Sequence, residues 1–318
     1  MKIAVTGASG FVGGPVCARL TAAGHAVRAI VRGDAPPPGL EAADIVTGCD
    51  LEREDAWDRV AAGSDVIVHL AARAHVMSDN PDTSDALYRR ANVHVTEGLA
   101  QAAVRHGVKR FVYMSSIKVN GERTGSRPFT PQDVPAPEDA YGRSKCEAEK
   151  VLLDIAAGNA MDAVIVRPPL LYGPHMRGNM LRLFQLVQTG LPLPLGSIIN
   201  ARDLLFVGNL AGLIEILVRH PGAAGRVVLA RDGQAISTPD LLKAIGKALG
   251  RRGWSFPFPV PALQIGAGLV GARGLASRLT QDLRVDDSLT RSLLGWTPAM
   301  TLEAALAETA QWFRGLKA

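Results

Sequence analysis

A tyrosine and a lysine stand four residues apart in the segment Tyr141-Gly142-Arg143-Ser144-Lys145. On an α-helix this spacing places both side chains on one face, one turn apart. A lysine ammonium beside a phenol favours the phenolate, so the tyrosine would exchange a proton near neutral pH. The same spacing also arises by chance as a surface pair on an amphipathic helix. The pair therefore indicates acid–base chemistry only where other features support it.

The first fourteen residues, MKIAVTGASGFVGG, supply a second candidate feature. Residues 3–5 form a short uncharged run that predicts a buried parallel strand. Apolar residues then recur at helical spacing, and Gly7, Gly10 and Gly13 lie between the two patterns. Glycines here let the backbone turn sharply and approach a pyrophosphate, which binds free N–H groups at the helix N-terminus. Placed between a strand and a helix, the spacing predicts dinucleotide binding.

Strands and helices alternate through the first half of the chain, which predicts parallel βαβ units in a doubly wound sheet. Gly107 and Gly158 stand where two of the helices should end. The predicted strands span residues 3–5, 26–31, 44–46, 65–70, 110–114 and 163–167, and the main predicted helices span residues 57–62, 84–106 and 141–157.

The alternation weakens beyond Pro168, where prolines and glycines cluster. Residues 226–230 still form an apolar run that would extend the first sheet. We therefore predict an α/β fold, a Rossmann doubly wound parallel sheet with a smaller, mainly helical C-terminal substrate lobe. The predicted dinucleotide-binding domain comprises residues 1–170 and about 203–232, and the predicted substrate lobe comprises about 171–202 and 233–318.

Composition narrows the class of protein. The 318 residues carry a formal net charge of +5, which suits an anionic ligand, but no Lys/Arg run indicates nucleic acid. Three scattered cysteines, Cys17, Cys49 and Cys146, indicate free thiols in a reducing cytoplasm, and no metal-ligand spacing occurs. The N-terminus lacks the features of a secretory signal, and the apolar stretch 259–272 is too short to span a bilayer, so we expect a core or lipid-adjacent helix there.

The glycine loop, the strand ending in Ser115-Ser116 and the Tyr-x-x-x-Lys pair, in this order, resemble the extended short-chain dehydrogenase/reductase family, and specifically its NAD-dependent epimerase/dehydratase branch acting on nucleotide sugars. The resemblance covers essentially the whole chain. It implies that Tyr141 is the general acid/base and that Lys145 is its electrostatic and cofactor-anchoring partner. Ser116 would hold the oxygen at the reacting carbon; the alternative is a serine that only satisfies backbone groups at the strand end.

The resemblance also implies ligand contacts. Asn92 would be a structural asparagine on the long helix, and Leu293-Leu294-Gly295-Trp296-Thr297-Pro298 matches the branch's C-terminal segment. The implied cofactor-binding residues are Gly7, Ser9, Gly10, Phe11, Val12, Gly13, Arg32, Asp50, Leu51, Leu70, Ala71, Ala72, Tyr141, Lys145 and Pro168. The implied substrate-binding residues are Ser115, Ser116, Asn179, Leu195 and Arg202, where Gly178-Asn179 and Arg202-Asp203 resemble positions that meet a nucleotide diphosphate.

Two departures from the family pattern bear on function. Sugar dehydratases of this branch carry an Asp-Glu pair after the catalytic hydroxyl residue, whereas this chain has Ile117-Lys118, which argues against dehydration. Members that prefer NAD carry an acid at the end of the second strand. Here Val31 is followed by Arg32, which favours NADP(H), with NAD(H) as the alternative because Asp34 could reach the ribose.

We therefore predict an NAD(P)H-dependent 4-ketoreductase that converts a UDP-4-keto-6-deoxy-N-acetylhexosamine to UDP-N-acetylquinovosamine or its 4-epimer, for surface polysaccharide. The segment SSIKVNGE resembles 4-ketoreductases of that type, and Asn120 stands where epimerases usually carry a tyrosine. A UDP-sugar 4-epimerase with tightly bound NAD is the close alternative. A non-catalytic dinucleotide sensor and a sterol- or flavonoid-type reductase fit the residues less well.

A homodimer is also expected, because helices 84–106 and 141–157 both carry apolar residues on more than one face, and the family pairs these helices across a two-fold axis. Glu147 and Glu149 are expected on the solvated face of the second helix, without a role. The apolar residues that suggest an intersubunit surface are Leu87, Ala91, Val95, Leu99, Val151, Leu152 and Ile155.

Overall fold

The computed structural model describes residues 1–36, 40, 44–74, 81–269 and 273–316. Its centre is a seven-stranded parallel sheet with the strand order β3-β2-β1-β4-β5-β6-β9. The order reverses between β1 and β4, as in a doubly wound Rossmann fold. The strands are β1 (Lys2–Thr6), β2 (Ala26–Ile30), β3 (Asp44–Val46), β4 (Val66–His69), β5 (Arg110–Met114), β6 (Asp162–Val166) and β9 (Val227–Val228).

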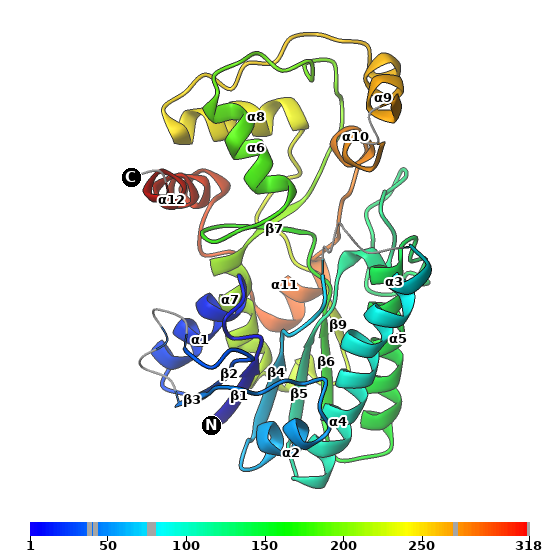
Figure 1. The fold of residues 1–318 in the computed structure, drawn as a ribbon, viewed down its shortest axis with the longest axis vertical. Coiled ribbons are helices and arrows are strands. Elements are labelled where there is room, and N and C mark those ends of the chain that lie inside the picture. The colour runs from blue at the N-terminus through cyan, green and yellow to red at the C-terminus, as the bar shows by residue number, and fades with distance from the viewer. Residues whose placement is uncertain (37–39, 41–43, 75–80, 270–272, 317–318) are drawn as a thin grey trace.

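Helices cover both faces of this sheet (Figure 1). Ile3 and Val5 of β1 point into the core under one face, whereas Ala4 points into the core under the other. Strands buried on both faces carry uninterrupted apolar runs, and for this reason the sequence predicted them well. One face holds α1 (Gly13–Ala22), α7 (Val207–Leu217) and α11 (Ser288–Leu294), and the other holds α2 (Asp55–Ala61), α4 (Val95–Arg105) and α5 (Ala140–Ala157).

All six predicted strands are present, β3 and β5 with the predicted bounds, and β9 extends the sheet beside β6 as expected. The helix predicted over residues 84–106 consists of α3 (Pro81–Tyr88), the π-helical turn η1 (Arg89–His94) and α4. Gly107, with φ +71°, follows its last turn as expected.

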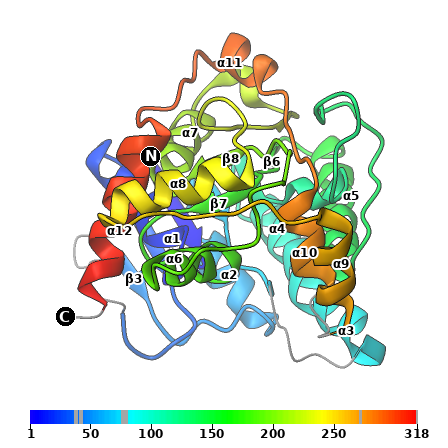
Figure 2. The ribbon, with the colours of Figure 1, turned by 90° about the horizontal axis from the view of Figure 1, so that it is seen from above.

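A smaller, mainly helical lobe lies above the sheet in Figure 1, and Figure 2 shows it from above. The predicted fold class is therefore confirmed. The boundaries predicted for two domains stay a prediction. Two residues of the predicted lobe, Leu294 at the end of α11 and Trp296 just after it, pack into the core of the sheet. The lobe contains β7 (Leu170–Tyr172), β8 (Leu204–Phe206), α6 (Asn179–Gln188), α8 (Thr238–Leu249), α9 (Val260–Leu269), α10 (Arg273–Thr280) and α12 (Leu302–Gly315).

The apolar stretch that predicted a core helix forms α9, and most of its described side chains are exposed. Ile265 is 67% exposed, and Pro261 and Ala262 also face solvent. Of the two alternatives expected for this stretch, the core helix is wrong, because overall hydrophobicity does not show whether other elements of the protein cover a helix. The lipid-adjacent helix stays a prediction. Among the described residues, no helix is both long and apolar enough to cross a membrane.

Several apolar residues that suggested a subunit interface are used inside the chain. Val95, Leu99 and Leu152 are at most 2% exposed and pack into the core between the sheet and its helices. Their assignment to an intersubunit surface is wrong, because a helix on an α/β sheet needs apolar residues for that sheet first. Leu87 remains 39% exposed and Ile155 is half-buried. The homodimer itself stays a prediction.

One extended segment, residues 281–287, joins the lobe to the sheet, and we call it the connector. On one side the Asp203 N–H donates to Leu283 O at 2.8 Å. On the other side the Phe129 N–H, in the long loop after β5, donates to Arg284 O at 2.9 Å. The connector therefore ties the loop that follows β5 to the chain entering β8.

Candidate active site

The loop between β1 and α1 requires glycine at two positions. Gly7 has φ +68°, and a Cβ there would lie 2.8 Å from the backbone nitrogen of Ala71. A Cβ on Gly13 would lie 2.2 Å from the carbonyl oxygen of Gly7. The loop therefore packs backbone against backbone, which pulls α1 against the carboxyl end of β1.

The tip of the same loop faces outward. Ser9 and Gly10 are exposed, and Phe11 and Val12 are half-buried. The backbone N–H groups of Phe11 and Val12 have no hydrogen-bond partner within the described chain. Free N–H groups at the start of a helix are the donors that bind a pyrophosphate, so the loop has the geometry that the predicted cradle requires. Binding of a pyrophosphate there stays a prediction.

The end of β4 lies against this loop. Thr6 Oγ1 accepts a hydrogen bond from the Ala71 N–H at 3.2 Å and lies 2.7 Å from Nδ1 of His69. Burial, and then the charge of Lys145, lower the pKa of His69 to about 3, so its ring is neutral. Leu70 and Ala71 are half-buried and Ala72 is exposed beside the cradle. No cluster of metal-ligating side chains occurs among the described residues.

The acid–base pair lies on the first turns of α5, with both side chains directed to the end of β5. Lys145 Nζ donates to Met114 O at 2.7 Å and to Tyr113 Oη at 3.1 Å. Burial lowers the pKa of Lys145 to about 7, while the carboxylate of Glu149 acts in the opposite direction. A side chain held in this way at the carboxyl end of the sheet is not the surface lysine that the alternative interpretation required.

Tyr141 lies beside Ser116. Burial raises the pKa of the Tyr141 phenol, the charge of Asp139 raises it further, and a hydrogen bond with Ser116 acts in the opposite direction. Ser116 Oγ also accepts from the Lys118 N–H at 3.2 Å, so it caps the short 3₁₀ turn η2 (Ile117–Val119). Ser116 therefore satisfies a backbone group and also contacts Tyr141. The three predicted catalytic residues, Ser116, Tyr141 and Lys145, thus lie in one cluster.

Ser115 and Glu149 differ from expectation. Glu149 is 3% exposed and forms an ion pair with Arg167 at 2.5 Å, so the expectation of a solvated carboxylate without contacts is wrong. Ser115 Oγ donates to Glu149, and Arg167 also donates to Asn120 Oδ1 at 2.9 Å. This network fixes the loop after β5, and the Ser115 hydroxyl is engaged inside the protein. Glu147, as expected, is on the outer face, where it pairs with an exposed arginine.

Asn92 joins the helices to the site. It lies in η1, where its Oδ1 accepts from the Arg73 N–H at 2.8 Å and its Nδ2 donates to Ser144 Oγ at 2.9 Å. Ser144 Oγ in turn donates to Tyr141 O at 2.8 Å. The π-helical turn thus directs an amide between the loop after β4 and the first turn of α5. This is the structural role that the resemblance implied.

The end of β2 carries the expected residues. Val31 is 2% exposed and Arg32 is exposed. The Cys49 N–H donates to Val31 O at 3.1 Å, which brings the next two residues, Asp50 and Leu51, beside the same edge. Val31, Arg32, Asp50 and Leu51 therefore lie together at the carboxyl ends of β2 and β3, on the side of the glycine loop. Pro168 is buried at the end of β6, and its carbonyl accepts from the Ile117 N–H at 3.0 Å.

Three of the predicted substrate residues, Asn179, Leu195 and Arg202, lie in the lobe, whereas Ser115 and Ser116 follow β5. Asn179 begins α6 and is half-buried, and Leu195 is 6% exposed in the lobe's core. Arg202 donates to Gln281 O at 2.9 Å, and burial, followed by the charge of Arg278, lowers its pKa to about 10. Two neighbouring arginines would attract a diphosphate.

Asp203, which follows Arg202, has a structural role. Its carboxylate accepts from the Val285 N–H at 2.7 Å and pairs with Arg231 at 3.3 Å. It therefore fixes the connector.

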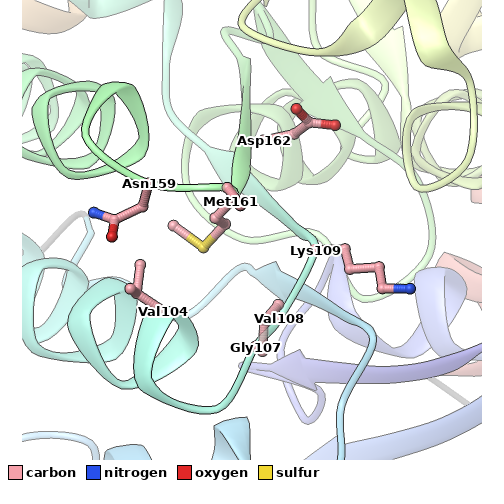
Figure 3. A pocket seen from close by; sticks show the side chains of 8 residues that line it. Val104, Gly107, Val108, Lys109, Asn159, Met161 and Asp162 are labelled. Atoms are coloured by element: carbon pink, nitrogen blue, oxygen red, sulfur yellow. The ribbon is translucent and has the colours of Figure 1, made fainter.

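A surface pocket of about 420 Å³ lies at the amino ends of β5 and β6, beside the ends of α4 and α5 (Figure 3). Val104, Lys109, Asn159 and Met161 are among its lining residues. The catalytic cluster lies at the opposite, carboxyl ends of the strands. Ligands of open α/β sheets bind at those carboxyl ends, so this pocket is not the active site.

Sequence reasoning missed four contributors: Tyr113, Glu149, Arg167 and Arg278. A usable signal existed for Glu149, because it stands four residues after Lys145 and so shares its helix face. Tyr113 was assigned only to a buried strand. Arg278 lies in a segment without a recognised motif and reaches Arg202 only through the tertiary fold.

Comparison with known proteins agrees with this geometry. The profile of the NAD dependent epimerase/dehydratase family matches residues 3–230. A UDP-glucose 4-epimerase of Vibrio cholerae is 41% identical over 98% of this chain and 95% of its own. The structure of a Thermotoga maritima UDP-glucose 4-epimerase with UDP-glucose superposes with a TM-score of 0.81 at 21% identity, covering 100% of both chains. A Bacillus cereus UDP-glucuronic acid 4-epimerase in complex with NAD gives 0.80 at 22%, again over 100% of both chains. The chain therefore belongs to the NAD dependent epimerase/dehydratase family, an extended short-chain dehydrogenase/reductase family of nucleotide-sugar enzymes.

Proposed function

We propose that the protein is an NAD(P)H-dependent 4-ketoreductase, which reduces a UDP-4-keto-6-deoxy-N-acetylhexosamine to UDP-N-acetylquinovosamine or its 4-epimer. The observation that carries this proposal is the end of β2. Val31 is buried where an NAD-specific member would present an acid, and the exposed Arg32 follows it. An arginine here suits the 2′-phosphate of NADP(H), and a reductant that is consumed suits a reductase.

The cofactor fits the residues that are present. The glycine loop offers free N–H groups at its tip, and its backbone packing leaves no room for side chains at Gly7 or Gly13. Residues of this loop, Arg32, the Asp50-Leu51 pair, the end of β4 and Pro168 would hold it. When bound, the reduced nicotinamide supplies the hydride. The solved structure of the Bacillus cereus UDP-glucuronic acid 4-epimerase is a complex with NAD, which supports a nicotinamide cofactor for this chain.

In the mechanism we propose, Ser116 holds the C4 oxygen of the sugar and Tyr141 gives its proton to that oxygen as negative charge develops there. Lys145 stabilises the phenolate that forms when Tyr141 gives up its proton. Hydrogen bonds to Met114 O and Tyr113 Oη hold the Lys145 ammonium in position. Arg202 and Arg278 would bind the diphosphate, with Asn179 and Leu195 beside the nucleotide.

Dehydration fits less well. Ile117 is 4% exposed in a hydrophobic cluster, and the Lys118 ammonium is bound to two carboxylates. Neither residue offers the acid and base that removal of water from the sugar requires. The site therefore favours oxidation and reduction at C4 alone.

A UDP-sugar 4-epimerase with tightly bound NAD is the second candidate. Its specific support is the 41% identity to the Vibrio cholerae UDP-glucose 4-epimerase over nearly the whole chain. Epimerization would use the same Tyr141, Lys145 and Ser116, first to oxidise and then to reduce C4.

The deciding experiment follows the absorbance of NADPH, and separately of NADH, with purified enzyme and a UDP-4-keto-6-deoxy-N-acetylhexosamine. We expect stoichiometric oxidation, faster with NADPH, and preference for NADH in Arg32→Asp. No oxidation with either cofactor, together with interconversion of UDP-GlcNAc and UDP-GalNAc without added cofactor, would assign the protein to the epimerases. Equal rates with both cofactors that Arg32→Asp leaves unchanged would remove the role of Arg32.

We also propose a cytoplasmic homodimer in which the outer face of α5 and that of the helix formed by α3, η1 and α4 meet their copies. The half-buried Val151 and Ile155 and the exposed Leu87 support this surface. Light scattering at micromolar concentration tests it, and a monomer mass would contradict it.

A further inference from the structure

Lys118 is the residue that stands in place of a dehydratase acid, and it contacts both halves of the catalytic cluster. Its backbone N–H donates to Ser116 Oγ at 3.2 Å. Its side chain donates to Asp139 and, at 2.8 Å, to Glu122 Oε1. The side chain is only 16% exposed, so these ion pairs lie in a partly dry environment in which they are stronger than at the surface.

Asp139 connects Lys118 to Tyr141. Asp139 is the N-cap of α5, and its Oδ1 accepts from the Gly142 N–H at 2.7 Å. Tyr141 stands two residues after this cap, in the first turn. Burial alone would raise the pKa of Asp139, but the hydrogen bonds from Lys118 and Gly142 outweigh it and lower that pKa. The carboxylate is therefore charged, and its charge opposes ionisation of Tyr141.

Gly142 shows how closely the two segments approach. A Cβ on this residue would lie 2.9 Å from the carbonyl oxygen of Lys118. The backbone of η2 thus rests directly on the first turn of α5. Lys118 contacts this turn twice, through its carbonyl beside Gly142 and through its ammonium at Asp139.

We propose that Lys118 is a positioning residue, which holds Ser116 and Tyr141 in register and offsets the charge of Asp139 beside the phenol. The inference rests on the proposed function in that Tyr141 must exchange a proton with substrate. It is independent of whether the reaction is a reduction or an epimerization.

The groups facing Tyr141 come from several elements. The ring of Tyr88, in α3, lies edge-on to the Tyr141 ring, with 6.0 Å between the ring centroids. Tyr113 of β5 interacts electrostatically with Tyr141, and Ser116 forms a hydrogen bond with it. The charged groups around the cap include Lys118, Glu122 and Asp139. Glu138, whose Oε1 accepts from the Glu122 N–H at 3.4 Å, and Arg143, which donates to Glu138 O at 3.3 Å, lie farther out. Because Lys118 is the cation that bonds both carboxylates, its loss would leave negative charge next to the phenol.

The test compares Lys118→Met, Lys118→Arg, Asp139→Asn and the double variant Lys118→Met/Asp139→Asn. Asparagine caps helices as well as aspartate does, so Asp139→Asn removes charge and keeps the cap. We measure kcat/KM for the C4 reaction against pH. Lys118→Met should move the apparent pKa of the catalytic group upward by about half a unit or more, Asp139→Asn should move it downward, and the double variant should return it towards the parent value.

Lys118→Arg should restore most of the parent profile. Lys247→Met is the matched control, because Lys247 pairs with Glu303 on the surface of the lobe and should leave the profile unchanged. Loss of activity in Lys118→Met without a pKa shift, or a shift that Asp139→Asn does not reverse, would overturn the proposal.

A second readout does not depend on turnover. The chain has four tyrosines, so the difference in phenolate absorbance between each variant and its Tyr141→Phe counterpart reports the titration of Tyr141. The same order of pKa values is expected there, and an unchanged Tyr141 titration in Lys118→Met would contradict the charge effect. If no nucleotide sugar is turned over, the proposed function fails, while this titration still decides the role of Lys118.

Discussion

Glu149 and Arg167 form an ion pair inside the protein, with both Nε and a terminal nitrogen of Arg167 donating to the carboxylate at 2.9 and 2.5 Å. The two side chains are 4% and 5% exposed. Because Ser115 and Asn120 complete the network, the pair locks the loop that carries Ser116 to β6 and α5.

Glu149→Gln should destabilise the protein by about 3–5 kcal/mol, because it leaves the Arg167 guanidinium buried without its counter-charge. Urea unfolding followed by circular dichroism measures this change. Glu303→Gln, which removes a carboxylate of an exposed pair, is the control and should leave the midpoint unchanged. Equal effects of the two substitutions would mean that burial of the Glu149 pair is not important.

Tyr141→Phe should lower kcat by about two or more orders of magnitude, because it removes the proton donor but keeps the ring. Cofactor affinity, measured by fluorescence titration, should change little, because the cradle is formed by the loop between β1 and α1. Turnover near the parent rate would remove the assignment of Tyr141 as the acid/base.

Lys145 should make stability depend on pH in the free enzyme. Its folded pKa of about 7 is below the unfolded value of a lysine, so between these values the unfolded chain binds more protons. The stability that the neutral Lys145 side chain contributes to the folded state is fully present above the unfolded pKa. It is lost as the pH falls through the folded pKa of about 7. Lys145→Met should therefore show a flatter dependence of unfolding free energy on pH over this window than the parent, and parallel curves would contradict the low pKa.

Gly13→Ala should prevent normal closure of the glycine loop, because its Cβ would lie 2.2 Å from Gly7 O. We expect a lower melting temperature and no thermal shift with NADPH or NADH. Gly14→Ala is the matched control one residue later, since its Cβ meets nothing within 4 Å, and alanine favours the helix. A normal thermal shift in Gly13→Ala would show that the loop can rearrange.

The central strands β1, β4, β5 and β6 were predictable because they are buried on both faces and carry uninterrupted apolar runs. The glycine loop and the Tyr-x-x-x-Lys helix were predictable because their residues recur at short, local spacing. Contacts made across the fold were not predictable in this way. Glu149 was placed in solvent because a helical pattern does not show that Arg167, directly after β6, lies against it. Val95 and Leu99 were placed on a subunit surface for the same reason, since an apolar stripe does not identify its partner. Ile265 shows the reverse error, an apolar residue left in solvent.

The path of the chain has a consequence for how the protein unfolds. The chain leaves the sheet after β6 for β7, α6 and β8, and returns to it with α7 and β9. It enters the lobe again at α8, packs α11 against the sheet and ends in the lobe with α12. The core between the sheet and α1, α7 and α11 is therefore not made from one continuous stretch of chain, and neither is the core of the lobe. We expect the two cores to melt together in a single cooperative transition, and a proteolytic cut near residue 170 to release no stable fragment, since each piece would lack strands or helices that the other supplies.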